Sequence, residues 1–78
     1  MLSRDFEELA DELLHSYDEE IERITLRINE KTETMNIIIC DKEGGILGIP
    51  FHNYLTWKYE DAWHHAEDIF YNHLTDLV

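Results

Sequence analysis

The spacing of apolar residues changes twice along the chain, and this change constrains the fold more than any other feature of the sequence. Between Leu2 and Tyr17, apolar residues recur at steps of three and four, as on one face of a helix. From Arg23 to Phe51 they recur mainly at every second position, which is the period of a β-strand. Steps of three and four return after residue 53. The sequence therefore predicts the order α-β-β-β-α.

The chain has 78 residues, which is enough for only one hydrophobic core. We therefore predict a single domain over residues 1–78, and a hydrophobic content of 44% argues against disorder. Cys40 is the single cysteine, so no intrachain disulfide can form, which favours a reducing compartment. No apolar run approaches the roughly 20 residues of a membrane span, and the first residues are acidic where a signal peptide would be basic. We therefore expect a cytoplasmic protein.

The two helices have recognisable starts and apolar stripes. Ser3 is suited to the N-cap of the first helix, whose stripe ends near Tyr17. The last helix is expected to begin near Asn53 or Thr56, either of which suits an N-cap. Its stripe is expected to run as far as Leu77.

Three segments, residues 23–28, 35–40 and 46–51, are expected to pair in that order as an antiparallel sheet. Pro50 cannot donate a ladder hydrogen bond, so the third strand suits an edge of the sheet. Each helix has one apolar stripe, and the strands offer one clearly apolar side. We therefore predict an α+β fold with a three-stranded antiparallel sheet and both helices packed on one face.

This packing leaves Ile38 and Cys40 on the far face of the central strand, close to Ile46 of the next strand. A homodimer contact or a partner would cover such an apolar patch, although scattered apolar residues are also common on monomer surfaces. Both interpretations stay open, and we name these three residues as the candidate dimer patch.

Acidic residues concentrate at the two ends of the chain. The net charge is -12, and residues 1–22 hold nine carboxylates against a single base, Arg4. Residues 60–78 hold five carboxylates and no lysine or arginine. Such a field repels nucleic acid and anionic membranes and attracts basic surfaces. We therefore predict a basic protein partner with no direct binding of nucleic acid or membrane, the alternative being that the charge only maintains solubility.

Carboxylates four residues apart on a helix are separated by about 6 Å along its axis, close to the spacing of successive phosphates on one nucleic-acid strand. Arginine and lysine side chains that bind phosphates also bind carboxylates. Aromatic residues commonly anchor interfaces, although several of those in this chain also suit the core. The predicted partner-binding residues are Glu7, Glu8, Asp11, Glu12, Asp18, Glu19, Glu60, Asp61, Glu67, Asp68, Trp57 and Tyr71.

Signatures of catalysis are weak, so we predict that the chain is not an enzyme and has no cofactor. Gly44 and Gly45 lie in an expected hairpin, whereas a phosphate-binding loop runs from a strand into a helix. Cys40 lies in an apolar strand, away from any group that would lower its pKa. The best metal candidate is a cluster of helical residues, but solvated histidines beside carboxylates are unspecific, and we predict no metal. This cluster comprises Asp61, His64, His65 and Asp68.

Three short strings carry a family resemblance: residues 26–29 (LRIN), 59–61 (YED) and 70–72 (FYN), ten residues of the chain. Together with the small size, the acidity and the predicted element order, they resemble the phage-encoded anti-CRISPR proteins that inhibit Cas9 by mimicking DNA. The resemblance implies that Glu60 and Asp61, which follow a tyrosine, enter the basic cleft that recognises the PAM. It also implies a CRISPR effector or other nuclease as partner and, for a phage protein, the host cytoplasm as location.

Two other functions stay open. An immunity protein or antitoxin that neutralises a basic toxin would need the same acidic face. A structural homodimer module would use the far face of the sheet, with the carboxylates acting only as a solvated surface. The αβββα order also matches double-stranded RNA-binding domains, but those need a basic face that this chain lacks.

Overall fold

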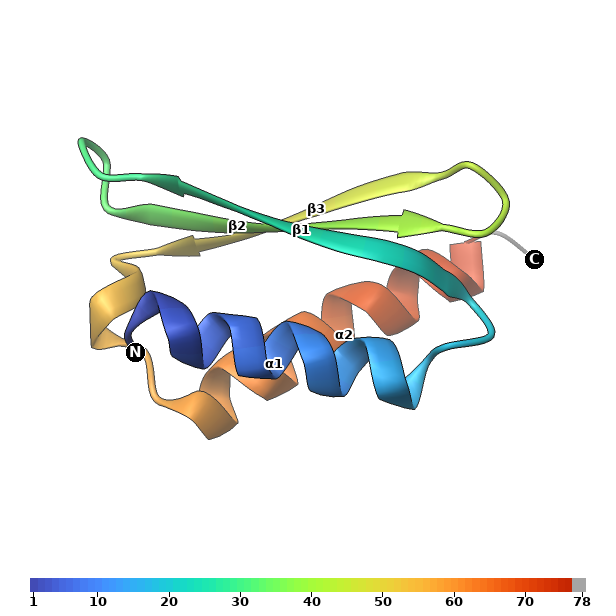
Figure 1. The fold of residues 1–78 in the computed structure, drawn as a ribbon, viewed down its shortest axis with the longest axis horizontal. Helices are drawn as coiled ribbons and strands as arrows, with labels where there is room; N and C mark the ends of the chain where they lie inside the picture. The colour runs from blue at the N-terminus through green and yellow to red at the C-terminus, as the bar shows by residue number, and fades with distance from the viewer. Residues whose placement is uncertain (77–78) are drawn as a thin grey trace.

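The computed structural model describes residues 1–76, which form the predicted order of elements (Figure 1). The elements are α1 (Ser3–Ser16), β1 (Ile21–Asn29), β2 (Thr34–Asp41), β3 (Ile46–His52), the short 3-10 helix η1 (Tyr54–Thr56) and α2 (Tyr59–Asp76). Leu77, the last expected position of the second apolar stripe, lies outside the described residues. The α-β-β-β-α order and the α+β class are confirmed.

The three strands form one antiparallel sheet with β2 in the centre, as predicted. Ile37 of β2 lies between Leu26 of β1 and Ile49 of β3, so apolar residues from all three strands share one face. Ile37 and Ile49 are fully buried, whereas Leu26 on an edge strand is half-buried. Pro50 lies in β3, the other edge strand, where a missing backbone donor is tolerated.

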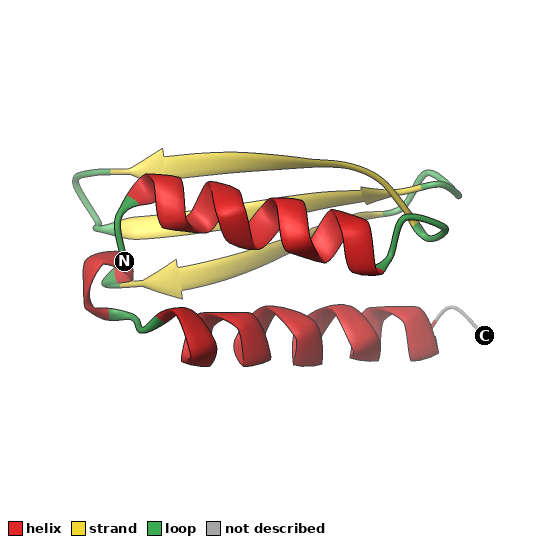
Figure 2. Cartoon of the chain, turned by 60° about the horizontal axis from the view of Figure 1, so that its bottom comes forward, coloured by secondary structure: helices red, strands yellow, loops and turns green. Residues whose placement is uncertain are grey.

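Both helices cover this apolar face of the sheet, and no element of residues 1–76 covers the opposite face (Figure 1). The helices lie side by side, α1 in contact with β1 and α2 in contact with β3 (Figure 2). Phe6, Leu9 and Leu13 of α1 and Phe70 of α2 have no exposed surface. Each fully buried side chain of this size contributes roughly 1.5–3 kcal/mol to stability, so the helical stripes hold the two layers together.

The prediction that Ser3 caps α1 was wrong by one position. Leu2 occupies the N-cap with an extended backbone, φ -79° and ψ 163°, and Ser3 is already helical. The Asp5 carboxylate accepts a hydrogen bond of 2.9 Å from the Leu2 backbone N–H. Asp5 therefore satisfies a free donor at the start of the helix, as the glutamate of a capping box does.

Neither Asn53 nor Thr56 caps α2, which begins at Tyr59. Asn53 instead caps η1 in a left-handed conformation with a φ of 53°, which asparagine tolerates better than most residues. The Thr56 hydroxyl donates to the Asn53 carbonyl at 2.8 Å and stays within the same turn. The extra 3-10 turn delays the start of α2, whose first hydrogen bond runs from the Ala62 N–H to the Lys58 carbonyl.

The turn between β2 and β3 is closed by the side chain of Asp41. One carboxylate oxygen accepts hydrogen bonds from the backbone N–H groups of Glu43 at 2.9 Å and Gly45 at 2.7 Å. The other oxygen lies 3.2 Å from Nε2 of His73 in α2. Gly44 supplies the positive φ, 89°, that the turn requires. Asp41 thus joins the turn to the last part of α2.

Within residues 1–76, neither helix is long and apolar enough to span a membrane.

Candidate functional site

The outer face of α1 is acidic. Phe6, Leu9 and Leu13 point toward the sheet, so the carboxylates predicted on the opposite face are exposed, as expected. These carboxylates are Glu7, Glu8, Asp11 and Glu12. Residues four apart are separated by about 6 Å along the helix axis, so the row presents regularly spaced negative charge.

The acidic surface continues on α2 and on the turn after α1. Asp18 and Glu19 are exposed in that turn, and Glu60 and Asp61 are exposed in the first helical turn of α2. Further along α2, Asp68 is also exposed, but the predicted site residue Glu67 is half-buried. The predicted carboxylates therefore lie on the helices and the turn after α1, and apart from the half-buried Glu67 they are exposed.

Basic side chains do not neutralise this layer. Arg4 is the only lysine or arginine in α1 and α2. Among residues 1–75, the two contacts within ion-pair distance both involve histidine, which is charged only when protonated: His64 lies 4.0 Å from Glu60, and His73 lies 3.2 Å from Asp41. The carboxylates of the helical layer are thus solvated and available to an external cation.

The opposite face of the molecule has a different charge. Arg23 and Arg27 of β1 are exposed and lie opposite Cys40 and Asn36 of β2, on the face that no helix covers. Negative charge on the helices and positive charge on the sheet are therefore separated by the thickness of the domain. This distribution attracts positively charged surfaces to the helical side and repels them from the arginines.

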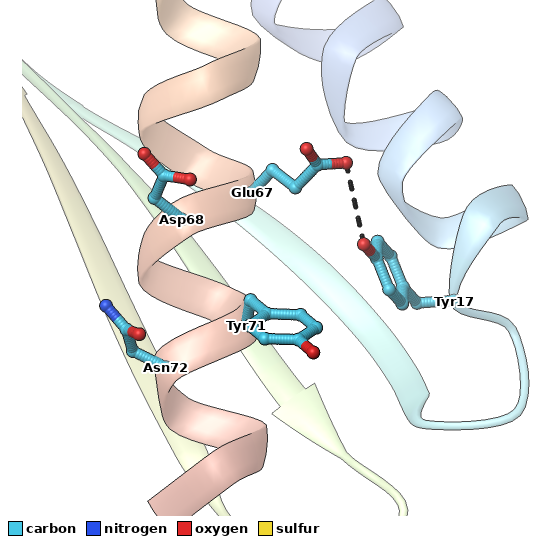
Figure 3. A pocket seen from close by; sticks show the side chains of 5 residues that line it. All are labelled: Tyr17, Glu67, Asp68, Tyr71 and Asn72. Atoms are coloured by element: carbon cyan, nitrogen blue, oxygen red, sulfur yellow. Dashed lines mark hydrogen bonds between the residues drawn. The ribbon is translucent and has the colours of Figure 1, made fainter.

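A hollow of about 440 Å³ lies between the end of α1 and the middle of α2 (Figure 3). We call it the tyrosine pocket, and its lining residues are Tyr17, Glu67, Asp68, Tyr71 and Asn72. Glu67 and Tyr71 extend from α2 toward Tyr17, whereas Asp68 and Asn72 lie on the other flank of α2 (Figure 3). The sequence predicted three of these residues as partner-binding, but it did not predict that Tyr17 would join them.

Tyr17 and Glu67 interact across the tyrosine pocket. The Tyr17 hydroxyl donates a long hydrogen bond of 3.5 Å to Oε2 of Glu67. Burial, followed by the nearby Glu67 carboxylate, raises the pKa of Tyr17 above its ordinary value. The hydroxyl therefore stays protonated at neutral pH and remains a donor. Its ring is held by an edge-on contact with Phe70, with centroids 4.9 Å apart.

A second hollow, of about 490 Å³, lies further along the two helices. Its lining residues are Asp11, Glu12, His15, Ser16 and Trp63. The indole of Trp63, which is half-buried, thus lies next to two of the predicted carboxylates. By their spacing, Tyr17 and Trp63 fit the apolar stripes of the two helices. An aromatic residue at the edge of a stripe, beside carboxylates, was the available sequence signal for a second role.

The two aromatic residues predicted to contact a partner differ in how the fold uses them. Trp57 is half-buried, its ring packs edge-on against Phe51 at 5.0 Å, and its indole N–H donates to the His52 carbonyl at 2.9 Å. Tyr71 is 63% exposed and lines the tyrosine pocket. Tyr71 is therefore more accessible to a partner than Trp57 is, and a contact between Trp57 and a partner stays a prediction.

Among the described residues, Tyr59 is the one buried polar side chain that makes no hydrogen bond of good geometry, although the Glu12 carboxylate lies near its hydroxyl. Its hydroxyl oxygen is buried at the start of α2. Burial first, and the Glu12 carboxylate second, raise the pKa of Tyr59 to about 12. The hydroxyl is therefore neutral at ordinary pH.

The histidines of α2 are directed to different neighbours. His65 packs against Phe51 and Trp57, and its Nε2 lies 3.1 Å from the Pro50 carbonyl. His64 is exposed and lies near Glu60. In the described part of the chain, no group of three His, Cys, Asp or Glu side chains is placed to hold a metal ion.

The candidate dimer patch lies on the uncovered face of the sheet. Cys40 pairs with Ile46 in the register, and Ile38 is two residues before Cys40 on the same face of β2. Ile46 is 72% exposed, while Ile38 and Cys40 are half-buried. The structure thus brings these three residues together, as predicted.

Fold and surface define a small α+β domain with an acidic helical layer and an open sheet face carrying arginines. Comparison with protein-family models, curated proteins and solved structures finds no match to this chain.

Proposed function

We propose that this chain is an inhibitor that occupies a basic, nucleic-acid-binding cleft of a nuclease or other defence protein. The observation that supports the proposal best is the acidic helical layer, whose exposed carboxylates have Arg4 as their only basic neighbour in the helices. A helix surface optimised for stability would interleave lysines with glutamates, because like charges three or four residues apart destabilise a helix. The concentration of one sign of charge favours a role in binding.

The proposed mechanism is steric and electrostatic. Carboxylates spaced along α1 at intervals of about 6 Å would be bound by the arginines and lysines that otherwise bind phosphates. The rigid helix pair would occupy the cleft, and nucleic acid would be excluded because both ligands need the same cationic side chains. The arginines on the sheet would point away from the partner.

The finer proposal names a CRISPR effector, Cas9, as the partner. It rests on the resemblance carried by residues 26–29, 59–61 and 70–72 to anti-CRISPR proteins. Glu60 and Asp61, both exposed in the first turn of α2, would then enter the cleft that recognises the PAM.

A charge-reversal experiment tests the proposal. Lysine at Glu8, Asp11 and Glu12 is expected to abolish inhibition of DNA cleavage by Cas9, and to abolish binding to any nuclease captured by the wild-type chain. The matched control places lysine at Glu30, Glu33 and Glu43, which are exposed in the two hairpin turns, so the net charge change is the same. Wild-type binding should weaken steeply as salt rises.

Two results would contradict the proposal. One is a partner that binds both triple variants with equal affinity, which would mean that the position of the carboxylates does not matter. The other is a ternary complex of the chain, its partner and nucleic acid in gel filtration, which would exclude competition for one cleft.

A second candidate function is a homodimer module that associates through the open sheet face. The observation that favours it is the 72% exposure of Ile46 beside Cys40 on a face that no helix covers. Self-association through this patch would leave the acidic helical layers on the two outer sides of the dimer.

A further inference from the structure

The tyrosine pocket contains a carboxylate in an unusual position. Glu67 is half-buried beside Tyr71 and faces Tyr17, and within residues 1–75 it forms no ion pair with a lysine, arginine or histidine. The hydrogen bond that it accepts from the Tyr17 hydroxyl is long at 3.5 Å. Partial burial of an ionised group is unfavourable unless a countercharge or good hydrogen bonds compensate for the lost water. An incoming cation would supply that compensation.

The rest of the pocket also suits a cation. Aromatic rings attract cations through their negative faces, and two tyrosines line this hollow. Tyr71 is 63% exposed, so its ring is available for contact with a ligand. Tyr17, held by Phe70, provides a fixed wall on the opposite side (Figure 3). Asp68 adds a second negative charge on the rim.

We propose that the tyrosine pocket binds the guanidinium group of an arginine side chain presented by the basic partner. This inference rests on the proposed function and specifies which group of the partner enters the helical layer. The guanidinium would stack on the Tyr71 ring while its N–H groups donate to the Glu67 carboxylate. The Tyr17 hydroxyl would keep its donation to the same carboxylate, because each carboxylate oxygen has more than one acceptor site.

Arginine fits this pocket better than lysine does. Its planar guanidinium stacks on aromatic rings and presents a fork of donors that matches a carboxylate. It is also more weakly hydrated than the lysine ammonium group, so entry into a half-enclosed hollow costs less desolvation. The pocket would therefore discriminate between two side chains of equal charge.

The test is a titration of the isotope-labelled chain with a blocked tetra-arginine peptide and, at the same salt concentration, with a blocked tetra-lysine peptide. Tetra-arginine should shift the ring resonances of Tyr17 and Tyr71 saturably and bind roughly tenfold more tightly than tetra-lysine. Tyr71→Ala and Glu67→Gln should each reduce that affinity by roughly tenfold. Unchanged amide shifts elsewhere in the spectrum would show that both variants remain folded.

Glu43→Gln is the matched control, because it removes the same charge from an exposed position in the β2–β3 turn, outside the pocket and outside the helical layer. Equal affinity for the two peptides, or an effect of Glu67→Gln no larger than that of Glu43→Gln, would overturn the inference. These results leave the proposed function intact if a nuclease still binds the α1 carboxylates. The opposite combination is also informative. If the pocket selects tetra-arginine but the triple reversal at Glu8, Asp11 and Glu12 leaves nuclease binding unchanged, only the proposed function is overturned.

Discussion

Oδ2 of Asp41, at the end of β2, lies 3.2 Å from Nε2 of His73 in α2, two residues that are 32 positions apart in the chain. A neutral imidazole can donate this hydrogen bond, and a protonated one adds charge. Because Asp41 also closes the turn before β3, one carboxylate joins the sheet layer to the helical layer at this end of the molecule.

This arrangement predicts a specific loss of stability in acid. The Gly45 N–H first, and then the His73 side chain, hold the pKa of Asp41 below its ordinary value. A lowered folded-state pKa stabilises the fold above the unfolded-state pKa, and this contribution is lost as pH falls through the folded-state value. We expect the free energy of unfolding, measured with urea, to decrease less between pH 6 and about pH 3 for Asp41→Asn than for the wild type. Asp68→Asn, at an exposed carboxylate, should retain the wild-type decline.

Gly45→Ala is expected to destabilise the β2–β3 turn. A Cβ atom at this position would collide with the Asp41 carboxylate and displace it from its two backbone donors. We expect a loss of about 1–3 kcal/mol in the free energy of unfolding. Gly48→Ala is the control, because a Cβ there meets no atom within 4 Å. An equal decrease in the melting temperature of both variants would contradict this account of the turn.

Tyr59→Phe is expected to leave stability unchanged or to raise it by about 1 kcal/mol, because it removes a buried hydroxyl that makes no hydrogen bond of good geometry, even with the nearby Glu12 carboxylate. The raised pKa of Tyr59, about 12, also makes the wild type sensitive to base. The neutral Tyr59 hydroxyl contributes fully to the stability of the fold below the unfolded-state pKa near 10. This contribution to stability is lost as pH rises toward 12. The free energy of unfolding should therefore decrease less at alkaline pH for Tyr59→Phe than for the wild type. A clear loss of stability of Tyr59→Phe at neutral pH would contradict the prediction, because it would indicate an important contact of the hydroxyl.

The resemblance to Cas9 inhibitors predicts an order of importance among the carboxylates. Lysine at both Glu60 and Asp61 should weaken binding to Cas9 more than lysine at Glu8 and Asp11, by at least about tenfold. The two double variants have the same net charge, so long-range attraction changes equally and the difference reports local contacts. Affinities from biolayer interferometry at one salt concentration would measure it, and the opposite order would contradict the role assigned to Glu60 and Asp61.

The dimer proposal makes its own prediction. Ile38→Glu should give a monomer that retains its helical circular dichroism, because a charge in an apolar contact is unfavourable and Ile38 is only half-buried within one chain. Sedimentation equilibrium would compare its mass with that of the wild type. Thr75→Glu, at an exposed position of α2, provides the same charge change away from the sheet. A wild type that is already monomeric at high concentration would exclude the dimer.

Regular spacing in the sequence predicted most of the core, but not Ile21, which is buried before the start of the expected first strand. Ile37 and Ile39 alternate with polar or half-buried neighbours and are buried as expected, because a strand directs every second side chain to the same face. The start of α2 was not predictable in this way. Asn53 and Thr56 both suit a cap by residue type, and only the short 3-10 turn determines that neither of them caps α2.

The candidate site, like the fold, has some features that the sequence predicted and others that it did not. The exposure of Glu8 and Asp11 followed from the apolar stripe on the other side of α1. The pairing of Tyr17 with Glu67 did not, since the two residues are 50 positions apart on different helices and meet only through tertiary packing. Local periodicity contains no information about which residues of two packed helices face each other across their contact.

Separating the acidic helices from the arginines of β1 gives the domain an electric dipole moment perpendicular to the sheet. In the field of a highly charged macromolecule, such a dipole experiences a torque within about a Debye length of the surface, roughly 8–10 Å at moderate salt. The domain would then turn its helices toward a positive surface before any side chains touch. Fewer encounters would be lost to wrong orientations, and the gain in association rate would disappear at high salt even where the final contacts survive.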